Sequence, residues 1–560
     1  MTRFSHAFAI GLAFWGLAGC GAPPAPAASQ AANLGAPHEH LGRIVDRFWD
    51  ERVSRVNALE PQLLADSLAL ERRFLAEILA VPRDPLDAES KLTYDIFRRQ
   101  REQDIEAFTY PAELLPINPF DGPPLELAWA AADMGQYPLK TAQDYVNWLP
   151  RIDESVRWMR QAIANMREGM RRGYTCPRLL VERALPLLQV LGEDTSGNVF
   201  YVPLRTLPET IKDPERTRLS STLSSAVKDK LLPGIRELHD FLQRDYLPRA
   251  RQSVALSALP LGSSWYASLV RRATDTSLTP NEIHAMGTAE VERLRARLQS
   301  FPPPPPIAGS ADLLTAYRDL KVQTLAAVPA LFSALPQADF EIRAANPVGG
   351  AGTALKYLPA AHGATPAILY VNAATGARPA GAEIAEFLRE TLPGRHLQNA
   401  LQQERADLPK FRRFGVAPAF VDGWALYAAS LGEELGLYRD DEAKRGAATA
   451  QLKCAAALVV DTGLHAKGWT HAQAVEYLRA QLALDEAGAA LLTDRFVAQP
   501  GDGLACKMGE LKFQALRIRA QQVLGPKFDY REFHSEVLKD GAMPLDILEA
   551  KLRVWMEARR

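Results

Sequence analysis

Two arginines, a glutamate and a histidine surround a Pro-Gly pair in the segment GAEIAEFLRETLPGRHLQNALQQ, which runs from Gly381 to Gln403. At metallopeptidase sites, histidines one helical turn apart hold zinc while a neighbouring glutamate acts as general base. Glu390 and His396 suit those two roles. Arg389 and Arg395, however, stand where further histidines would be expected. The segment therefore indicates zinc-peptidase chemistry in which the metal ligands have changed.

The spacing within this segment requires a break in the helix. Residues 389 and 396 would share a face of a straight helix but lie about 10 Å apart along its axis. Pro393 and Gly394 predict the break, because proline removes a backbone hydrogen bond and glycine allows unusual dihedral angles. A lone glutamate and histidine on a helix are more often ordinary core or surface residues. The alternative is therefore that this segment has no catalytic or metal-binding role.

Later segments supply further candidates. FVDGWALY places Asp422 on a second helix, where a carboxylate can complete a zinc shell. DTGLHAKGW adds Asp461 and His465, and the glycine-rich turn PGDGLACKMG leads into another helix. Tyr427, at the end of FVDGWALY, is a candidate for ligand contact, although core packing is the simpler interpretation of that aromatic pair.

The order of the long motifs resembles that of a bacterial protein family catalogued as a domain of unknown function. The resemblance rests on LPLGSSWYASLVRRATDTSLTPNEIHAMGTAEVERL, LPGRHLQ, FVDGWALYA, VVDTGLHAKGW and FDYREFHSEVLKDGAMPLDILE, and it covers nearly all of the mature chain. Members of that family look like secreted or lipid-anchored helical zinc metallopeptidases, related to the gluzincins and to thermostable carboxypeptidase Taq. The resemblance implies a fold of that kind.

The central motif of the family looks like HExxPGHHLQ, and this chain has RETLPGRHLQ in its place. Glu390 matches the presumed general base and His396 matches one metal ligand. Arg389 and Arg395 replace the other two histidines. An arginine has no lone pair to donate to zinc, and its positive charge repels the ion.

The other motifs match unevenly. Asp422 stands where the family's VEGWALY has a glutamate, one methylene longer. Asp461 and His465 match, whereas Asp502 and Cys506 replace a glutamine and a tyrosine of PGQALxYKxG. These departures from the family pattern stand at the presumed metal-binding and catalytic positions. The leading hypothesis is therefore an inactive homologue that binds no cofactor, with zinc expected only if the site is still competent.

Three functions stay open. The first is a binding protein for peptides or other carboxylates, in which Arg389 and Arg395 clamp a carboxylate beside Glu390, His396 and His465. The second is a hydrolase with a rearranged metal site made of His396, Asp422 and His465, with Glu390 as base. The third is a structural lipoprotein whose arginines neutralise Glu390 and Asp422.

The N-terminus predicts export and lipid anchoring. Residues 1–19 carry Arg3 and an apolar run of signal-peptide length, too short to span a bilayer. The run ends in LAGC, which resembles the lipobox of bacterial lipoproteins and implies lipid attachment to Cys20. Residues 20–37 would then form the tether. Gly21 after the cysteine favours the outer membrane, facing the periplasm; a plain secretory signal is the alternative.

Composition limits the partners and the cross-links. With 65 Lys+Arg against 66 Asp+Glu, the formal net charge of -1 gives no reason to expect nucleic acid as a partner. Cys176, Cys454 and Cys506 are far apart and odd in number, which predicts buried free thiols rather than a disulfide framework. Lys507 beside Cys506 leaves a reactive thiol as the alternative.

The elements that must position these residues are mainly helical. Residues 38–300 are predicted to form an N-terminal helical part and residues 301–560 a metallopeptidase-like part, together one continuous family domain. FEIRAA, LKYL and AILYVN predict a small β-sheet just before the site helix. Such a strand can hold an extended peptide by edge pairing.

Overall fold

The computed structural model describes residues 37–52, 59–132, 139–302, 313–345, 355–360, 366–372 and 381–560. The predicted signal peptide, Cys20 and nearly all of the predicted tether lie outside these ranges. Within them, no helix is both long enough and apolar enough to cross a membrane.

The N-terminal part of the chain is helical, as the three- and four-residue spacing of its apolar residues predicts. Its helices are α1 (Pro37–Glu51), α2 (Pro61–Leu79), α3 (Ala88–Ala107), α4 (Pro123–Ala131), α5 (Ala142–Arg172), α6 (Arg178–Gly192), α7 (Val202–Arg205), α8 (Glu215–Ser225), α9 (Leu232–Phe241), α10 (Gly262–Thr274) and α11 (Pro280–Gln299). Short 3-10 or π-helical turns join several of them: η2 (Ala112–Leu114), η3 (Val199–Tyr201), η4 (Ala226–Leu231), η5 (Leu242–Tyr246), η6 (Leu247–Arg249) and η7 (Leu256–Ala258).

The C-terminal part begins with a small sheet and then continues as helices. Its elements are α12 (Leu313–Ala327), η8 (Val328–Ala330), β1 (Phe340–Ala344), β2 (Leu355–Leu358), β3 (Ala367–Val371), α13 (Gly381–Glu390), α14 (Arg395–Glu404), α15 (Lys410–Arg413), α16 (Pro418–Ser430), α17 (Asp441–His465), α18 (His471–Leu482), α19 (Glu486–Ala498), α20 (Leu504–Leu524), η10 (Gly525–Lys527), α21 (Tyr530–Leu538) and α22 (Leu545–Arg559). The predicted mainly helical fold with a small sheet before the site helix is confirmed.

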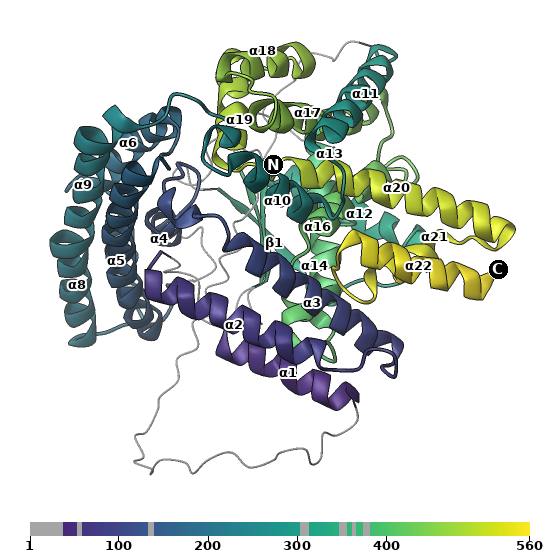
Figure 1. Cartoon of the computed structure of the whole chain (residues 1–560), viewed down its shortest axis with the longest axis horizontal. Helices are drawn as coiled ribbons and strands as arrows, with labels where there is room; N and C mark the ends of the chain where they lie inside the picture. Colours follow the sequence, from purple (N-terminus) through teal and green to yellow (C-terminus); the bar gives the residue numbers. More distant parts are fainter. Residues whose placement is uncertain are drawn as a thin grey trace.

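The helices gather in groups around the sheet (Figure 1). Helices α5, α6, α8 and α9 stand side by side on one flank, and α20 and α22 extend to the other. Between these flanks lie α13, α14 and α16, which carry the candidate site. The site helices are therefore covered from several directions by packed helices.

Several helix ends follow from local sequence signals. Thr279 and Thr470 begin α11 and α18 with capping boxes, in which the threonine side chain and the residue three positions later satisfy each other's backbone N–H groups. Gly173, with a φ of 78°, ends α5 in the left-handed conformation that glycine adopts without strain. These boundaries are set locally and depend little on the rest of the fold.

The sheet lies between two hydrophobic cores. Its strand order is β1-β3-β2, with β1 parallel and β2 antiparallel to the central β3. Successive side chains of a strand point to opposite faces. Leu369 and Val371 join a core shared with α1 to α3 and the C-terminal helices, whereas Ile368 and Tyr370 join the core of α4 to α9. The sheet therefore links the two halves of the chain.

The predicted break at Pro393 and Gly394 is confirmed, since α13 ends at Glu390 and α14 begins at Arg395. The Leu392–Pro393 peptide bond is cis. A Cβ on Gly394 would lie 2.1 Å from the carbonyl oxygen of Arg389, so the chain passes too close for any other residue. The break turns Arg395 back toward the end of α13.

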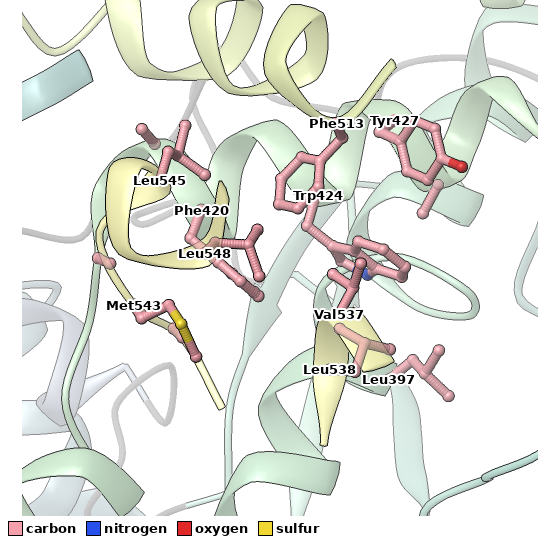
Figure 2. Close-up of a cluster of buried hydrophobic side chains, with 14 of the residues drawn as sticks. Leu397, Phe420, Trp424, Tyr427, Phe513, Val537, Leu538, Met543, Leu545 and Leu548 are labelled. Carbon is pink, nitrogen blue, oxygen red and sulfur yellow. The ribbon is translucent and has the colours of Figure 1, made fainter. Parts of the chain in front are cut away.

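An aromatic core holds this break in place (Figure 2). Trp424 and Tyr427 of α16 lie against Phe513 of α20, and Leu397 of α14 joins the same cluster. The indole Nε1 of Trp424 donates to the carbonyl oxygen of Pro393 at 3.1 Å. The aromatic residues of FVDGWALY are thus core residues that also fix the connection between the two site helices.

Cys454 of α17 and Cys506 of α20 form a disulfide bond, with their Cα atoms 6.0 Å apart. The prediction of free thiols is therefore wrong for both residues, and a reactive Cys506 thiol is excluded while the bond is intact. The two cysteines are 52 positions apart in the sequence, and the packing of α17 against α20 brings them together. Cys176 is free and buried, as predicted.

Candidate functional site

The guanidinium of Arg395, at the start of α14, lies between two carboxylates. Its Nε donates to Oε2 of Glu390 at 3.1 Å, and its Nη1 donates to Oδ1 of Asp422 at 2.9 Å. Both acids are buried, Glu390 with 3% and Asp422 with 8% of its surface exposed. Burial opposes the positive charge of Arg395, but the two carboxylates outweigh it and raise its pKa above the usual value.

Arg389 occupies the last turn of α13 and pairs with Glu386 one turn earlier. Its Nη1 lies 3.2 Å from Oε1 and 3.1 Å from Oε2 of that glutamate. Burial favours the neutral form of Glu386, but nearby positive charges, with Arg389 the largest, outweigh it and lower its pKa. Arg389 is buried, and its Nε has no hydrogen-bond partner among the described residues. That N–H is therefore a buried donor whose hydrogen bond is not made within the described part of the chain.

His396 follows Arg395 in sequence but contacts other partners. Its Nδ1 lies 3.0 Å from the hydroxyl of Tyr357, and its Nε2 lies 3.1 Å from the carbonyl oxygen of Ala338. A carbonyl oxygen only accepts, so Nε2 donates and Nδ1 accepts from Tyr357. Burial lowers the pKa of His396 to about 4, which keeps the ring neutral. Both ring nitrogens are therefore engaged.

Asp461 and His465 belong to a separate buried network. Asp461 accepts from the hydroxyl of Tyr266 at 2.6 Å and from the Gly501 N–H at 3.0 Å, and burial raises its pKa to about 7. His465 accepts from the Leu256 N–H at 3.1 Å and lies 2.9 Å from the Phe496 carbonyl oxygen. Main-chain groups thus contact both ring nitrogens of His465. Neither nitrogen bonds to the arginine cluster, which consists of Arg389 and Arg395 with their partners Glu386, Glu390 and Asp422.

Tyr427 points into the aromatic core. Its hydroxyl lies 2.9 Å from Nε2 of His534, and Nδ1 of that histidine lies 2.9 Å from the Leu331 carbonyl oxygen. Burial raises the pKa of Tyr427 and lowers that of His534 to about 4. The pair joins α16 to α21 inside the core, an arrangement that suits structural support.

Several of these partners were not predicted from the sequence. Glu386 stands three residues before Arg389, so helical spacing alone could have identified it. Tyr266 lies 195 residues from Asp461, and His534 lies 107 residues from Tyr427 and 203 from Leu331, so no local signal pairs them although both belong to long motifs. Lys507 is fully buried and forms ion pairs of 2.9 and 2.6 Å with Glu290 and Glu510, rather than acting on Cys506.

The described side chains do not fit a zinc ion at this site. Arg389 and Arg395 cannot donate a lone pair, and both nitrogens of His396 already have partners. Across the described part of the chain, no group of three or more His, Cys, Asp or Glu side chains is placed to hold a metal ion. Whether the protein binds zinc stays a prediction.

The sequence comparison decides the family. A family model described as "Bacterial protein of unknown function (DUF885)" matches residues 39–302 and 299–552. The chain belongs to the DUF885 family. The predicted membership in a bacterial family of unknown function is confirmed, while the relationship of this DUF885 protein to gluzincins and carboxypeptidase Taq stays a prediction. No curated protein is significantly similar in sequence.

Two solved structures share the fold of this DUF885 protein. A candidate lipoprotein from Colwellia psychrerythraea matches with a TM-score of 0.84 and 21% identity, covering 93% of this chain and 100% of the other. A candidate lipoprotein of unknown function from Shewanella oneidensis matches with a TM-score of 0.64 and 14% identity, covering 92% and 99%. At these identities the likeness concerns the fold alone.

Proposed function

We propose that this DUF885 protein is a lipid-anchored envelope protein in which an arginine-centred ion-pair cluster replaces the zinc site of a metallopeptidase-like fold. In this proposal it binds a peptide or another carboxylate without hydrolysing it. The bridge from Arg395 to Glu390 and Asp422 carries the proposal. In this proposal the protonated side chain of Arg395 takes the place of the metal ion that would otherwise balance the charges of Glu390 and Asp422.

The same bridge argues against catalysis. A zinc peptidase needs about three protein ligands with an open position for water, and a carboxylate free to act as base. Glu390 is instead held by Arg395 at 3.1 Å. Placing a metal ion beside the guanidinium would bring two positive charges together in a buried region, which is costly.

The unpaired Nε of Arg389 supports ligand binding over a purely structural role. A buried donor without a partner costs free energy, and an incoming carboxylate would satisfy it with a charge-assisted hydrogen bond. The nearby β2 is an edge strand, because β3 is central in the sheet. An extended peptide could pair with that edge while its carboxylate reaches Arg389.

The lipid anchor rests on the N-terminal sequence. The apolar run ending in LAGC precedes Cys20, and both structural relatives carry the description of candidate lipoproteins. We place the anchor in the outer membrane, with the folded part in the periplasm. Radiolabelled palmitate incorporation into the full-length protein, lost on Cys20→Ala, tests this part of the proposal.

Metal content of residues 21–560, measured by mass spectrometry after exposure to zinc and removal of excess, tests the loss of the metal site. We expect less than one tenth of an equivalent. A stoichiometric metal that disappears on His396→Ala would contradict the proposal and favour the rearranged hydrolase. Restoring Arg389→His, Arg395→His and Asp422→Glu together should recover zinc binding.

Calorimetry with N-acetyl-trialanine tests the binding function, because this peptide carries one carboxylate and no ammonium. We expect binding to the wild type that is lost for the C-terminal amide of the same peptide. Arg389→Gln should weaken it at least tenfold, or about 1.4 kcal/mol. Equal affinity for acid and amide would contradict the carboxylate clamp.

A further inference from the structure

A cavity of about 300 Å³ lies between α14, α15 and the ends of β2 and β3. Its polar wall consists of Asn399, Gln403, Glu404 and Arg413, and His396 and Tyr357 also face it. Its volume is at the lower end of the range for small-molecule pockets. The carboxylates bound by Arg395 and Arg389 do not line it, so it is distinct from the arginine cluster.

Arg413 and Glu404, which carry opposite charges, both line this cavity without forming an ion pair with each other. Nε of Arg413 donates to the carbonyl oxygen of Gln403, the residue before Glu404, at 2.5 Å. Arg413 is half-buried and Glu404 is exposed. Nη1 and Nη2 of Arg413 have no hydrogen-bond partner among the described residues. Oε1 of Glu404 accepts from the Ala338 N–H at 2.8 Å, and Oε2 has no partner in the same part of the chain. The two terminal nitrogens of Arg413 and one carboxylate oxygen of Glu404 are thus available to contact a ligand.

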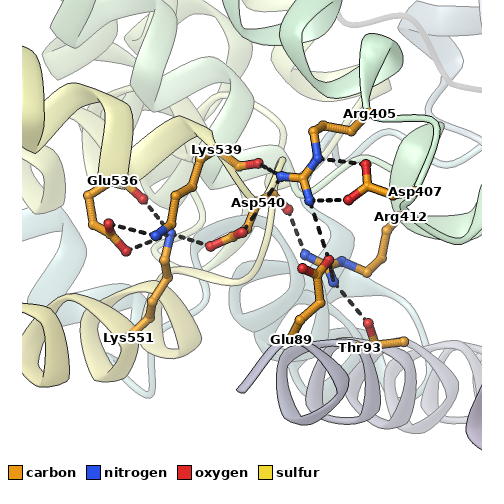
Figure 3. A network of polar contacts seen from close by, with 9 residues as sticks. All are labelled: Glu89, Thr93, Arg405, Asp407, Arg412, Glu536, Lys539, Asp540 and Lys551. Carbon is orange, nitrogen blue, oxygen red and sulfur yellow. Dashed lines mark hydrogen bonds and ion pairs between the residues drawn. The ribbon is translucent and has the colours of Figure 1, made fainter. Parts of the chain in front are cut away.

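The wall that carries Arg413 is firmly held. The neighbouring Arg412 is buried and donates to the hydroxyl of Thr93 at 2.8 Å and to the carbonyl oxygen of Asp540 at 2.7 Å (Figure 3). Arg405, before α15, pairs with Asp407 at 2.6 Å in the same network. The guanidinium of Arg413 also stacks on Phe414, 5.2 Å from the ring centroid. Fixed neighbours restrict the motion of this wall, which lowers the entropy lost on binding.

The remaining wall offers amides and small apolar side chains. Asn399 and Gln403 stand one helical turn apart on α14, and their side-chain amides have no hydrogen-bond partner among the described residues. Ala400, Ala360 and Ala367 supply apolar surface. His396 and Tyr357 are bonded to each other and form a neutral wall. The wall therefore suits a compact ligand with both polar and apolar parts.

We propose that this cavity binds a free amino acid as its zwitterion, with the α-carboxylate on Arg413 and the α-ammonium on Glu404. In an α-amino acid the two charges flank one carbon, which suits two charges of opposite sign that line one cavity and are not paired with each other. A ligand with a single charge would engage only one of the two groups and gain less binding free energy. Asn399 and Gln403 would then contact the ligand's side chain.

Thermal unfolding of residues 21–560 with each free L-amino acid in millimolar excess tests the proposal. We expect at least one amino acid to raise the melting temperature, while its N-acetyl and carboxamide derivatives do not. Calorimetry with the best amino acid should then show affinities at least tenfold weaker for Arg413→Gln and for Glu404→Gln. If no amino acid raises the melting temperature, the proposal is wrong.

Three further variants separate the possible outcomes. Asn399→Trp, at a half-buried helix position, fills the cavity and should abolish binding even if Arg413→Gln proves unstable. Arg479→Gln, in an exposed ion pair outside the cavity, is the control and should leave amino-acid affinity unchanged. Binding that survives Asn399→Trp and is lost on Arg389→Gln would overturn the proposal and assign the amino acid to the arginine cluster.

Discussion

Arg395 and Asp422 form a buried ion pair of 2.9 Å that joins α14 to α16. The same guanidinium holds Glu390 at 3.1 Å, so one cation balances two buried acids. Because the three residues come from the end of α13, the start of α14 and the middle of α16, this contact fixes the relative positions of the three site helices.

Arg395→Gln should destabilise the protein by about 3 kcal/mol at pH 7, because it leaves two buried carboxylates without a positive partner. Urea unfolding measures the loss. Arg479→Gln is the matched control, since Arg479 and its partner Glu476 are largely exposed and their pair contributes under about 1 kcal/mol. Equal losses in the two variants would show that the Arg395 bridge has no special role.

Gly394→Ala should destabilise by at least about 2 kcal/mol, because the new Cβ would lie 2.1 Å from the Arg389 carbonyl oxygen and 2.5 Å from that of Leu388. Gly42→Ala in α1 is the control, since nothing lies within 4 Å of its Cβ position. That change should be neutral or stabilising by roughly 0.5–1 kcal/mol. If both variants melt alike, the close passage at Gly394 is not required.

Cys454→Ser combined with Cys506→Ser should lower stability by about 4 kcal/mol in the chain-entropy model for a loop of 52 residues. The melting temperature of the wild type should likewise fall under a reductant. Cys176→Ala alone should keep that sensitivity to reductant. Labelling of three thiols in residues 21–560, in denaturant without reductant, would contradict the disulfide.

His534→Gln tests the pH dependence of the core. Burial lowers the folded-state pKa of His534 to about 4, against about 6.5 in the unfolded chain. Between these values the unfolded state binds the extra proton, so this contribution to stability is present above pH 6.5 and is lost as the pH falls toward 4. The wild type should therefore lose up to about 3 kcal/mol relative to the variant. A difference that stays constant from pH 7 to pH 4 would contradict this.

Short-range features were predictable from the sequence. The caps at Thr279 and Thr470, the stop at Gly173 and the break at Gly394 all depend on neighbouring residues and on the dihedral angles that each residue type allows. The three strands follow from short β-branched and aromatic runs between turn residues. The sequence also determined which residue types lie at the site, namely two arginines beside a glutamate and a histidine.

Contacts between distant segments were decided by the tertiary structure. Nothing in the spacing of Cys454 and Cys506 shows that α17 and α20 pack closely enough for a disulfide. His465 and Asp461 are candidate site residues from the sequence alone, and only the fold shows that they bind main-chain groups of distant turns. The sequence left Arg395 either as a clamp for a carboxylate or as the cation that neutralises Glu390 and Asp422, and it could not decide between these roles. The return of the chain at Gly394 and the packing of α16 make it the cation between Glu390 and Asp422, because an ion pair depends on distance in space and not on separation along the chain.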